Sequence, residues 1–208
     1  MGIVIIGRGV RMPKNKIIVD GLDRRLEFAD FPKDINLNWD CLNKDIIPKL
    51  VSPNSIVSFT SPLLICGGAS AERTTLACGI AAQQLVKNWR VKYMPVNLYI
   101  DMLRVAMHDD TDALFNLQHL KNDIEVFVWD NLVVGTYTEW EKTNLYQTMQ
   151  YRIEVKGYKD IISTYFTKSK HVDFNKSFGE SLYSLLFENN RFKYLELPTV
   201  KTSRWEEK

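Results

Sequence analysis

Residues 63–74 read LLICGGASAERT, an apolar run followed by two glycines and a polar segment. Its apolar start closes the run Ser55–Cys66, whose composition predicts a buried strand. Gly67 and Gly68 then end the strand, and Glu72–Lys87 carries apolar residues at helical spacing. A strand, a glycine turn and a helix in this order are typical of an α/β domain.

The turn has the frame of a phosphate-binding loop, G-x-x-x-x-G-K-[ST]. In such a loop, backbone N–H groups surround phosphates, a lysine reaches the terminal phosphates, and a hydroxyl holds magnesium. Here Glu72 replaces the second glycine and brings negative charge and a restrictive Cβ. Arg73 replaces the lysine with a bulkier fork, while Thr74 keeps the hydroxyl. The loop therefore opposes ATP binding, and by itself it also fits an ordinary glycine turn before a helix.

A second apolar run, Ile124–Trp129, ends at Asp130 and Asn131. Continuous runs of this kind are typical of strands that are buried on both faces of a parallel sheet. An acid at the carboxyl end of such a strand lies where ligands bind. Asp130 is thus a candidate to hold magnesium through water, but Asn131 is an amide and cannot act as a general base beside it.

The remaining chain continues the alternation of strands and helices. Thr138 and Glu141 form a capping-box pattern at the start of a long helix, and Gly157 is its stop signal. Alternation predicts a parallel sheet with right-handed crossovers. The further strands expected are Arg90–Val96, Asp160–Phe166 and Phe192–Leu197, and the further helices are Asp40–Leu50, Leu98–Val105, Asp112–Lys121, Thr138–Val155 and Phe178–Asn189.

Composition fits one intracellular domain. The chain has 208 residues, 45% of them hydrophobic, and a net charge of +2, which gives no strong polycation signal. Cys41, Cys66 and Cys78 have no disulfide or zinc spacing, so we expect buried thiols in a reducing cytoplasm. His108 and His119 lack a ligand partner at metal spacing, so no metal of the protein's own is assigned. No run approaches the roughly 18 apolar residues of a membrane span, so no membrane partner is expected.

Together, these features resemble the AAA+ domain of DnaC/DnaI-type bacterial helicase loaders and their IstB relatives, over roughly Leu26 to Trp205. The order and spacing of several short stretches carry the resemblance. They are FADFP (28–32), LLICG (63–67), RVKY (90–93), VWDNL (128–132), EWE (139–141) with Leu145 and Tyr146, YR (151–152), and GESLYSLL (179–186).

The resemblance implies a P-loop α/β fold of the AAA+ type, with a lid that is minimal or absent here. It also implies where a vestigial nucleotide site would lie. Arg73 would meet phosphate, Thr74 magnesium and Asp130 the water on that magnesium. The full set is Gly67, Gly68, Ser70, Glu72, Arg73, Thr74, Asp130 and Asn131, with Thr164 and Tyr165 at the sensor position.

The departures from the family's pattern affect its catalytic parts. Loaders usually end the strand after the long helix with Thr-Ser-Asn, which senses the γ-phosphate, whereas this chain has Ser163-Thr164-Tyr165. Ser181 and Leu185 stand where the family places two arginines, one of which reaches a neighbouring subunit's nucleotide. We therefore expect no catalytic residues and no cofactor, with ATP and magnesium bound only if the pocket is still open.

Residues 1–25 form a hairpin or basic arm in this interpretation, and residues 26–208 form the AAA+-like domain. The basic residues Arg8, Arg11, Lys14 and Lys16 are candidates for DNA contact, although solvated surface charge is the favoured explanation. Only about 25 residues precede the matching region, so the family's N-terminal route to the helicase is not implied.

Three functional hypotheses follow. The first is a replication or mobile-element accessory protein, such as a phage protein. It would bind a replicative helicase, a helicase loader or other AAA+ subunit, or DNA, without turning over ATP. The second is a weak ATPase that a partner completes. The third is a structural subunit of a larger assembly or oligomer.

Overall fold

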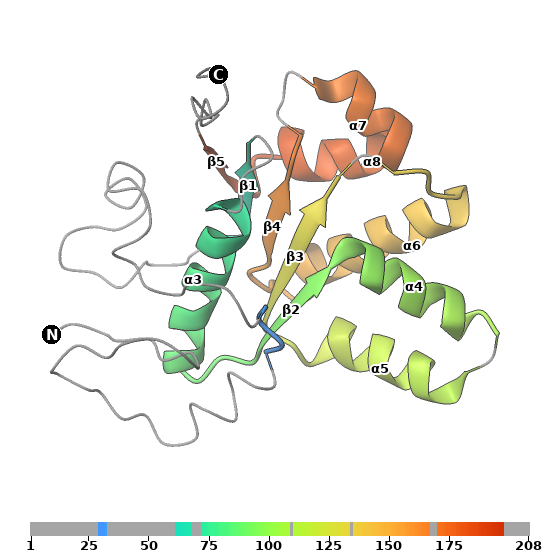
Figure 1. The fold of residues 1–208 in the computed structure, drawn as a ribbon, viewed down its shortest axis with the longest axis horizontal. Helices are drawn as coiled ribbons and strands as arrows, with labels where there is room; N and C mark the ends of the chain where they lie inside the picture. The colour runs from blue at the N-terminus through green and yellow to red at the C-terminus, as the bar shows by residue number, and fades with distance from the viewer. Residues whose placement is uncertain are drawn as a thin grey trace, which may run out of the picture.

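The computed structural model describes residues 29–32, 61–67, 72–108, 110–133, 135–166 and 170–197, without the side chains of Glu72 and Val86. A five-stranded sheet in the order β2-β3-β4-β1-β5 lies at its centre, and all neighbouring strands are parallel (Figure 1). The strands are β1 (Leu63–Cys66), β2 (Val91–Pro95), β3 (Val126–Leu132), β4 (Ile161–Thr164) and β5 (Lys193–Glu196). The expected parallel α/β sheet is thus confirmed.

Helices cover both faces of this sheet. In the described chain, α3 (Glu72–Val86) covers one face, and the other helices lie on the opposite side (Figure 1). These are α4 (Val96–Ala106), α5 (Thr111–Asn122), α6 (Glu139–Gln150), α7 (His171–Phe178) and α8 (Glu180–Tyr183), with π-helical turns η2 (Tyr151–Val155) after α6 and η4 (Ser184–Glu188) after α8.

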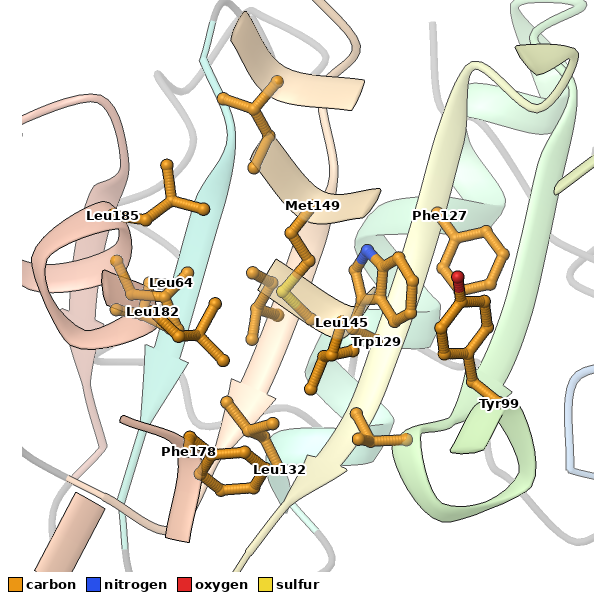
Figure 2. Packing of buried hydrophobic residues seen from close by; sticks show 14 of the residues in the cluster. Leu64, Tyr99, Phe127, Trp129, Leu132, Leu145, Met149, Phe178, Leu182 and Leu185 are labelled. Atoms are coloured by element: carbon orange, nitrogen blue, oxygen red, sulfur yellow. The ribbon is translucent and has the colours of Figure 1, made fainter. Parts of the chain in front are cut away.

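Alternate side chains along the strands contribute to two main hydrophobic cores, one on each face of the sheet. Leu64, Phe127 and Trp129 pack with α4, α6 and α8 in the larger core (Figure 2). Leu63 and Val128 belong to the smaller core under α3. Because both faces are covered, the strands read as continuous apolar runs rather than as alternating patterns.

The long helix after β3 begins as its capping box predicts. The backbone N–H of Glu141 donates to Thr138 Oγ1 at 3.2 Å, and the N–H of Thr138 donates to Glu141 Oε2 at 2.8 Å. The helix continues to Val155, as expected, but its last turn is π-helical, with a hydrogen bond of 3.0 Å from Lys156 N–H to the Tyr151 carbonyl. Gly157 follows with φ of 67°, as a helix stop requires.

Several expected boundaries were wrong. Ser61 and Pro62 precede β1 instead of belonging to it, and β3 runs on through Asp130 to Leu132. The helix expected from Phe178 starts at Glu180, because Gly179 has φ of 85° and separates two helices. The other strands differ from expectation by one or two residues at their ends.

Helix α7 was not expected at all. No helix was predicted between Asp160–Phe166 and Phe178–Asn189, but His171 begins one there. The buried residues Phe174 and Phe178 lie four residues apart, and this spacing is the signal that indicates a helix. The expected segment 1–25, the helix Asp40–Leu50 and the question of a lid lie outside the described residues.

A buried ion pair ties the helices to the amino end of the sheet. Arg152 and Asp160 are both fully buried, with the Arg152 Nη2 and Asp160 Oδ1 atoms 2.6 Å apart. Asp160 also accepts from Trp129 Nε1 at 2.8 Å, and Arg152 donates to the Ile124 carbonyl at 3.0 Å. Hydrogen bonds to every side of a buried pair offset the cost of removing its charges from water. This pair fixes the end of the sheet opposite to Gly67, where the candidate phosphate-binding loop begins.

Candidate nucleotide-binding site

The candidate site forms where the carboxyl ends of the central strands meet the start of α3. Asp130, which is 4% exposed, lies in β3 and faces α3. The Thr74 hydroxyl lies 3.0 Å from each of its carboxylate oxygens, and the Tyr93 hydroxyl donates to Oδ2 at 2.8 Å. The Ser163 hydroxyl donates to Oδ1. The structure thus joins two predicted residues, Thr74 and Asp130, with two that were not predicted.

These hydroxyls occupy much of the acceptor capacity of the carboxylate. An ionised carboxylate offers about four lone-pair sites, and here both oxygens accept hydrogen bonds from protein groups. Thr74 and Asp130 are the pair expected to hold magnesium and its water, yet they bond to each other. A cation could enter between them only by breaking this contact.

Arg73 folds back onto its own loop. Its Nη1 donates to the Gly67 carbonyl at 2.5 Å, and the residue is only 7% exposed. Burial lowers the pKa of the guanidinium from its ordinary value, while the negative charge of Asp130 opposes that shift. Gly68, Ser70 and the Glu72 side chain are not described, so the structure places only part of the predicted loop.

The end of β5 covers the start of the loop. Leu197 N–H donates to the Cys66 carbonyl at 2.8 Å, directly beside Gly67. A Cβ on Gly67 would lie 3.1 Å from both the Cβ and the carbonyl oxygen of Leu197, and Gly67 has φ of 154°. A side chain at this position would be strained by the backbone and would crowd Leu197, just after β5, so glycine here serves close packing as well as the turn.

The two predicted sensor residues lie in different environments. Thr164 is buried on the face opposite Asp130 and donates to the Leu132 carbonyl at 2.7 Å. Tyr165 is partly exposed at the end of β4, with the Lys170 ammonium 3.5 Å from its ring centre. Asn131 has φ of 61° and an exposed side chain, and its backbone N–H donates to Ser163 Oγ at 3.1 Å.

Tyr93 and Ser163 are the site residues that sequence reasoning missed. Tyr93 pairs with Val128, two residues before Asp130, so both side chains point to the same face. Ser163 is a polar residue inside the apolar strand β4 and is 1% exposed. A buried hydroxyl requires a partner, which was the available signal. At the arginine positions of the family, Ser181 is exposed on α8 and Leu185 is 2% exposed in the core.

The strand order and this site define the class of fold. Five parallel strands, with a glycine turn and a helix after β1 and an aspartate in β3, make up the AAA+-type α/β fold that the sequence predicts. In the described part of the chain, no helix is long and apolar enough to cross a bilayer.

Solved structures share this fold. The crystal structure of the DnaC helicase loader is 21% identical, with a TM-score of 0.58 over 73% of this chain and 86% of that one. Domain III of the replication initiation protein DnaA from Thermotoga maritima is 16% identical, with a TM-score of 0.54 over 76% and 68% of the two chains. For DnaI the identity is 14%, the TM-score 0.53 and the coverage 88% of both chains. No protein-family model matches the sequence, and no curated protein matches it.

Proposed function

We propose that this chain is a helicase-loader-like accessory protein of DNA replication that binds partners without turning over ATP. The main support for a loss of ATP chemistry is that the carboxylate of Asp130 accepts hydrogen bonds from the hydroxyls of Thr74, Tyr93 and Ser163. The fold likeness to DnaC, DnaI and DnaA supports a role in replication.

Three features of the site support a retired ATPase. Arg73 directs its guanidinium to the Gly67 carbonyl rather than outward. The residue beside Asp130 is the amide Asn131, which cannot orient a water as a base. Ser181 lacks the charge of the family's arginine, so it cannot stabilise phosphate on a neighbouring subunit.

The partners belong to the proposal as well. They are a replicative helicase, a helicase loader or another AAA+ subunit, with DNA as a further candidate through Arg8, Arg11, Lys14 and Lys16. These basic residues lie outside the described part of the chain. A cytoplasmic location and a phage or mobile-element setting complete the proposed role.

Calorimetric titration with ATP and magnesium tests the central claim without knowledge of the partner. We expect no saturable heat at millimolar ATP. Binding at micromolar ATP would instead make the partner-completed ATPase the better account, because Arg73 would then replace the lysine. Purified helicase, loader and DNA, each titrated against the labelled protein, form the second arm, and binding to none of them would contradict the adaptor role.

Restoring the consensus loop residues distinguishes a pocket that has lost only those residues from one that the surrounding side chains have closed. The double change Glu72→Gly and Arg73→Lys recovers the consensus residues, while Arg90→Lys, at a half-exposed position, is the matched control. We expect no gain in ATP affinity from the double variant, and a gain only when Tyr93→Phe also removes a hydroxyl from Asp130. A gain from the loop alone would mean that the network around Asp130 does not close the site.

A further inference from the structure

A group of basic and aromatic side chains lies at the amino end of the sheet, away from the candidate nucleotide-binding site. It comes from the helix ends and loops that lead from α3 into β2, from α5 into β3 and from η2 into β4. Because the strands are parallel, these three segments reach the sheet at the same end. We define the basic face by four lysines and the two rings beside them, which are Lys87, Lys121, Lys156, Lys159, Trp89 and Tyr151.

Hydrogen bonds join the three segments into one surface. The Tyr151 hydroxyl donates to Asn122 Oδ1 at 3.2 Å, which connects η2 to the end of α5. The backbone N–H of Lys159 donates to the Glu125 carbonyl at 3.3 Å, and the N–H of Glu125 donates to the Arg90 carbonyl at 3.0 Å. The segments that carry the lysines are therefore fixed relative to one another.

Three lysines of the basic face lie against aromatic rings. Lys121 Nζ and Lys156 Nζ lie 4.6 Å and 5.8 Å from the centre of the Tyr151 ring, and Lys159 Nζ lies 5.1 Å from the centre of the Trp89 ring. Within the described ranges, none of the three lies at ion-pair distance from a carboxylate. A ring attracts an ammonium group but carries no net charge. The positive charge of these lysines is thus positioned without being neutralised.

Like charges also lie close together on the basic face. Partial burial lowers the pKa of Lys87 from its ordinary value, and the positive charge of Lys159 lowers it further. The acids of the same segments have cationic or imidazole partners of their own, in the pairs Glu125–Arg90, Asp123–His119, Glu154–Arg191 and Asp160–Arg152. An anion bound beside Lys87 and Lys159 would relieve their repulsion.

We propose that the basic face binds single-stranded DNA, with its lysines on phosphates and with bases against the partly exposed rings of Trp89 and Tyr151. Proteins that bind single strands combine positive charge along the backbone with aromatic side chains on which bases stack. An acidic peptide would use the charge but leave the rings unused. The inference deepens the proposed role in replication, on which the choice of DNA rests, and it assigns the contact to residues other than Arg8 and Arg11.

Fluorescence anisotropy of a labelled oligo(dT) of about 16 nucleotides, titrated with the complete chain, measures this binding. We expect saturable binding that weakens with salt, with a slope of about −3 in log affinity against log salt concentration for four contacted phosphates. Absence of binding at low salt would overturn the inference. Polyglutamate that competes as well as unlabelled oligo(dT) would overturn it too, because charge alone would then account for the binding.

Variants locate the contact. Lys156→Gln with Lys159→Gln should weaken binding at least tenfold and make the salt slope shallower by about 1.4. Lys142→Gln with Lys176→Gln removes the same charge from α6 and α7 and should leave binding unchanged. Tyr151→Leu should weaken binding at least fivefold through loss of the ring. Lys156 is exposed, so Lys156→Gln alone provides a second route to weaker binding, should another variant fold poorly. Full affinity in Lys156→Gln would contradict the basic face.

A further pair of substitutions distinguishes failure of this inference from failure of the proposed function. Loss of DNA binding in Arg8→Gln with Arg11→Gln, and none in Lys156→Gln with Lys159→Gln, would overturn the basic face but leave a DNA-binding accessory protein. Conversely, DNA binding that depends on Lys156 and Lys159, together with micromolar ATP binding, would support the basic face and contradict the proposed loss of ATP chemistry.

Discussion

Asp130 connects three elements through its side chain. Its oxygens accept hydrogen bonds from Thr74 of α3, Tyr93 of β2 and Ser163 of β4. A buried carboxylate requires such donors, because an ionised group that is removed from water without them is strongly destabilising. The same residue that would serve magnesium in an ATPase therefore serves stability here.

Replacing Asp130 by alanine should consequently unfold the protein more easily, whatever nucleotide is present. The variant loses hydrogen bonds to a charged group and leaves buried hydroxyls without their acceptor, which together should lower the free energy of unfolding by roughly 3 kcal/mol. Urea denaturation measures this change. Asp123→Ala, at a half-exposed carboxylate paired with His119, is the control and should change stability by less than about 1 kcal/mol.

Unfolding in the presence of magnesium tests the opposite possibility, that Asp130 binds a metal ion. A site that binds Mg²⁺ in the folded state would be stabilised by it, and the unfolding midpoint of the wild-type protein would rise with the concentration of the ion. We expect no such rise. A midpoint that increased in wild-type protein but not in Asp130→Ala would restore Asp130 to a metal-binding role.

At the level of elements, the start of α6 is fixed by charge as well as by capping. Burial acts to raise the pKa of Glu141, but hydrogen bonds from Arg104 and from the Thr138 backbone outweigh it, so the pKa lies below its ordinary value of 4.5. The Arg104 Nε and Glu141 Oε1 atoms are 2.6 Å apart. A depressed folded-state pKa means that ionised Glu141 stabilises the folded protein at neutral pH.

The lowered pKa of Glu141 makes its contribution to stability depend on pH. The stabilisation is complete above the unfolded-state pKa and is lost as the pH falls through the lower folded-state pKa. Glu141→Gln should therefore melt at a lower temperature than wild type at pH 7, and the gap should shrink below about pH 4.5. Thermal unfolding across this range measures it. A gap that stays constant with pH would mean that the residue acts through shape alone.

How far sequence predicts an element depends on how local its causes are. The capping box at Thr138 and the buried runs of β1 and β3 follow from neighbouring residues, and they were predicted. No local sequence pattern predicts the π-helical turns or the hydrogen bonds of Tyr93 and Ser163 to Asp130, because they depend on how distant elements pack. Helix α7 was missed although Phe174 and Phe178 carried its spacing.

At the scale of the whole molecule, the sheet order makes the domain depend on its last strands. Strand β1 is paired with β4 and β5, and β3 is paired with β2 and β4. A fragment that ends at Gly157 would keep β1 and β3 but lose the strand between them. Strand β1 would then have neither of its neighbours, β4 and β5, and β3 would keep only β2.

We therefore expect the fragment 1–157 to show no cooperative thermal transition by circular dichroism, whereas the complete chain unfolds in a single step. The physical reason is that β2 and β3 alone can neither accept the hydrogen bonds of the unpaired β1 backbone nor cover the exposed apolar side chains. A sharp transition in the fragment would indicate that β2, β3, α4 and α5 form an independent unit.

The position of β1 also matters while the chain is being synthesised. Leu63 leaves the ribosome long before its partners Ile161 and Lys193, so this apolar strand exists for most of translation without either neighbour. Pairings between residues so distant in sequence form slowly, and an unpaired apolar strand in a nascent chain is prone to aggregate. We therefore expect β1 to need protection by molecular chaperones during synthesis, and we expect high-level expression to be limited by its exposure rather than by the stability of the finished fold.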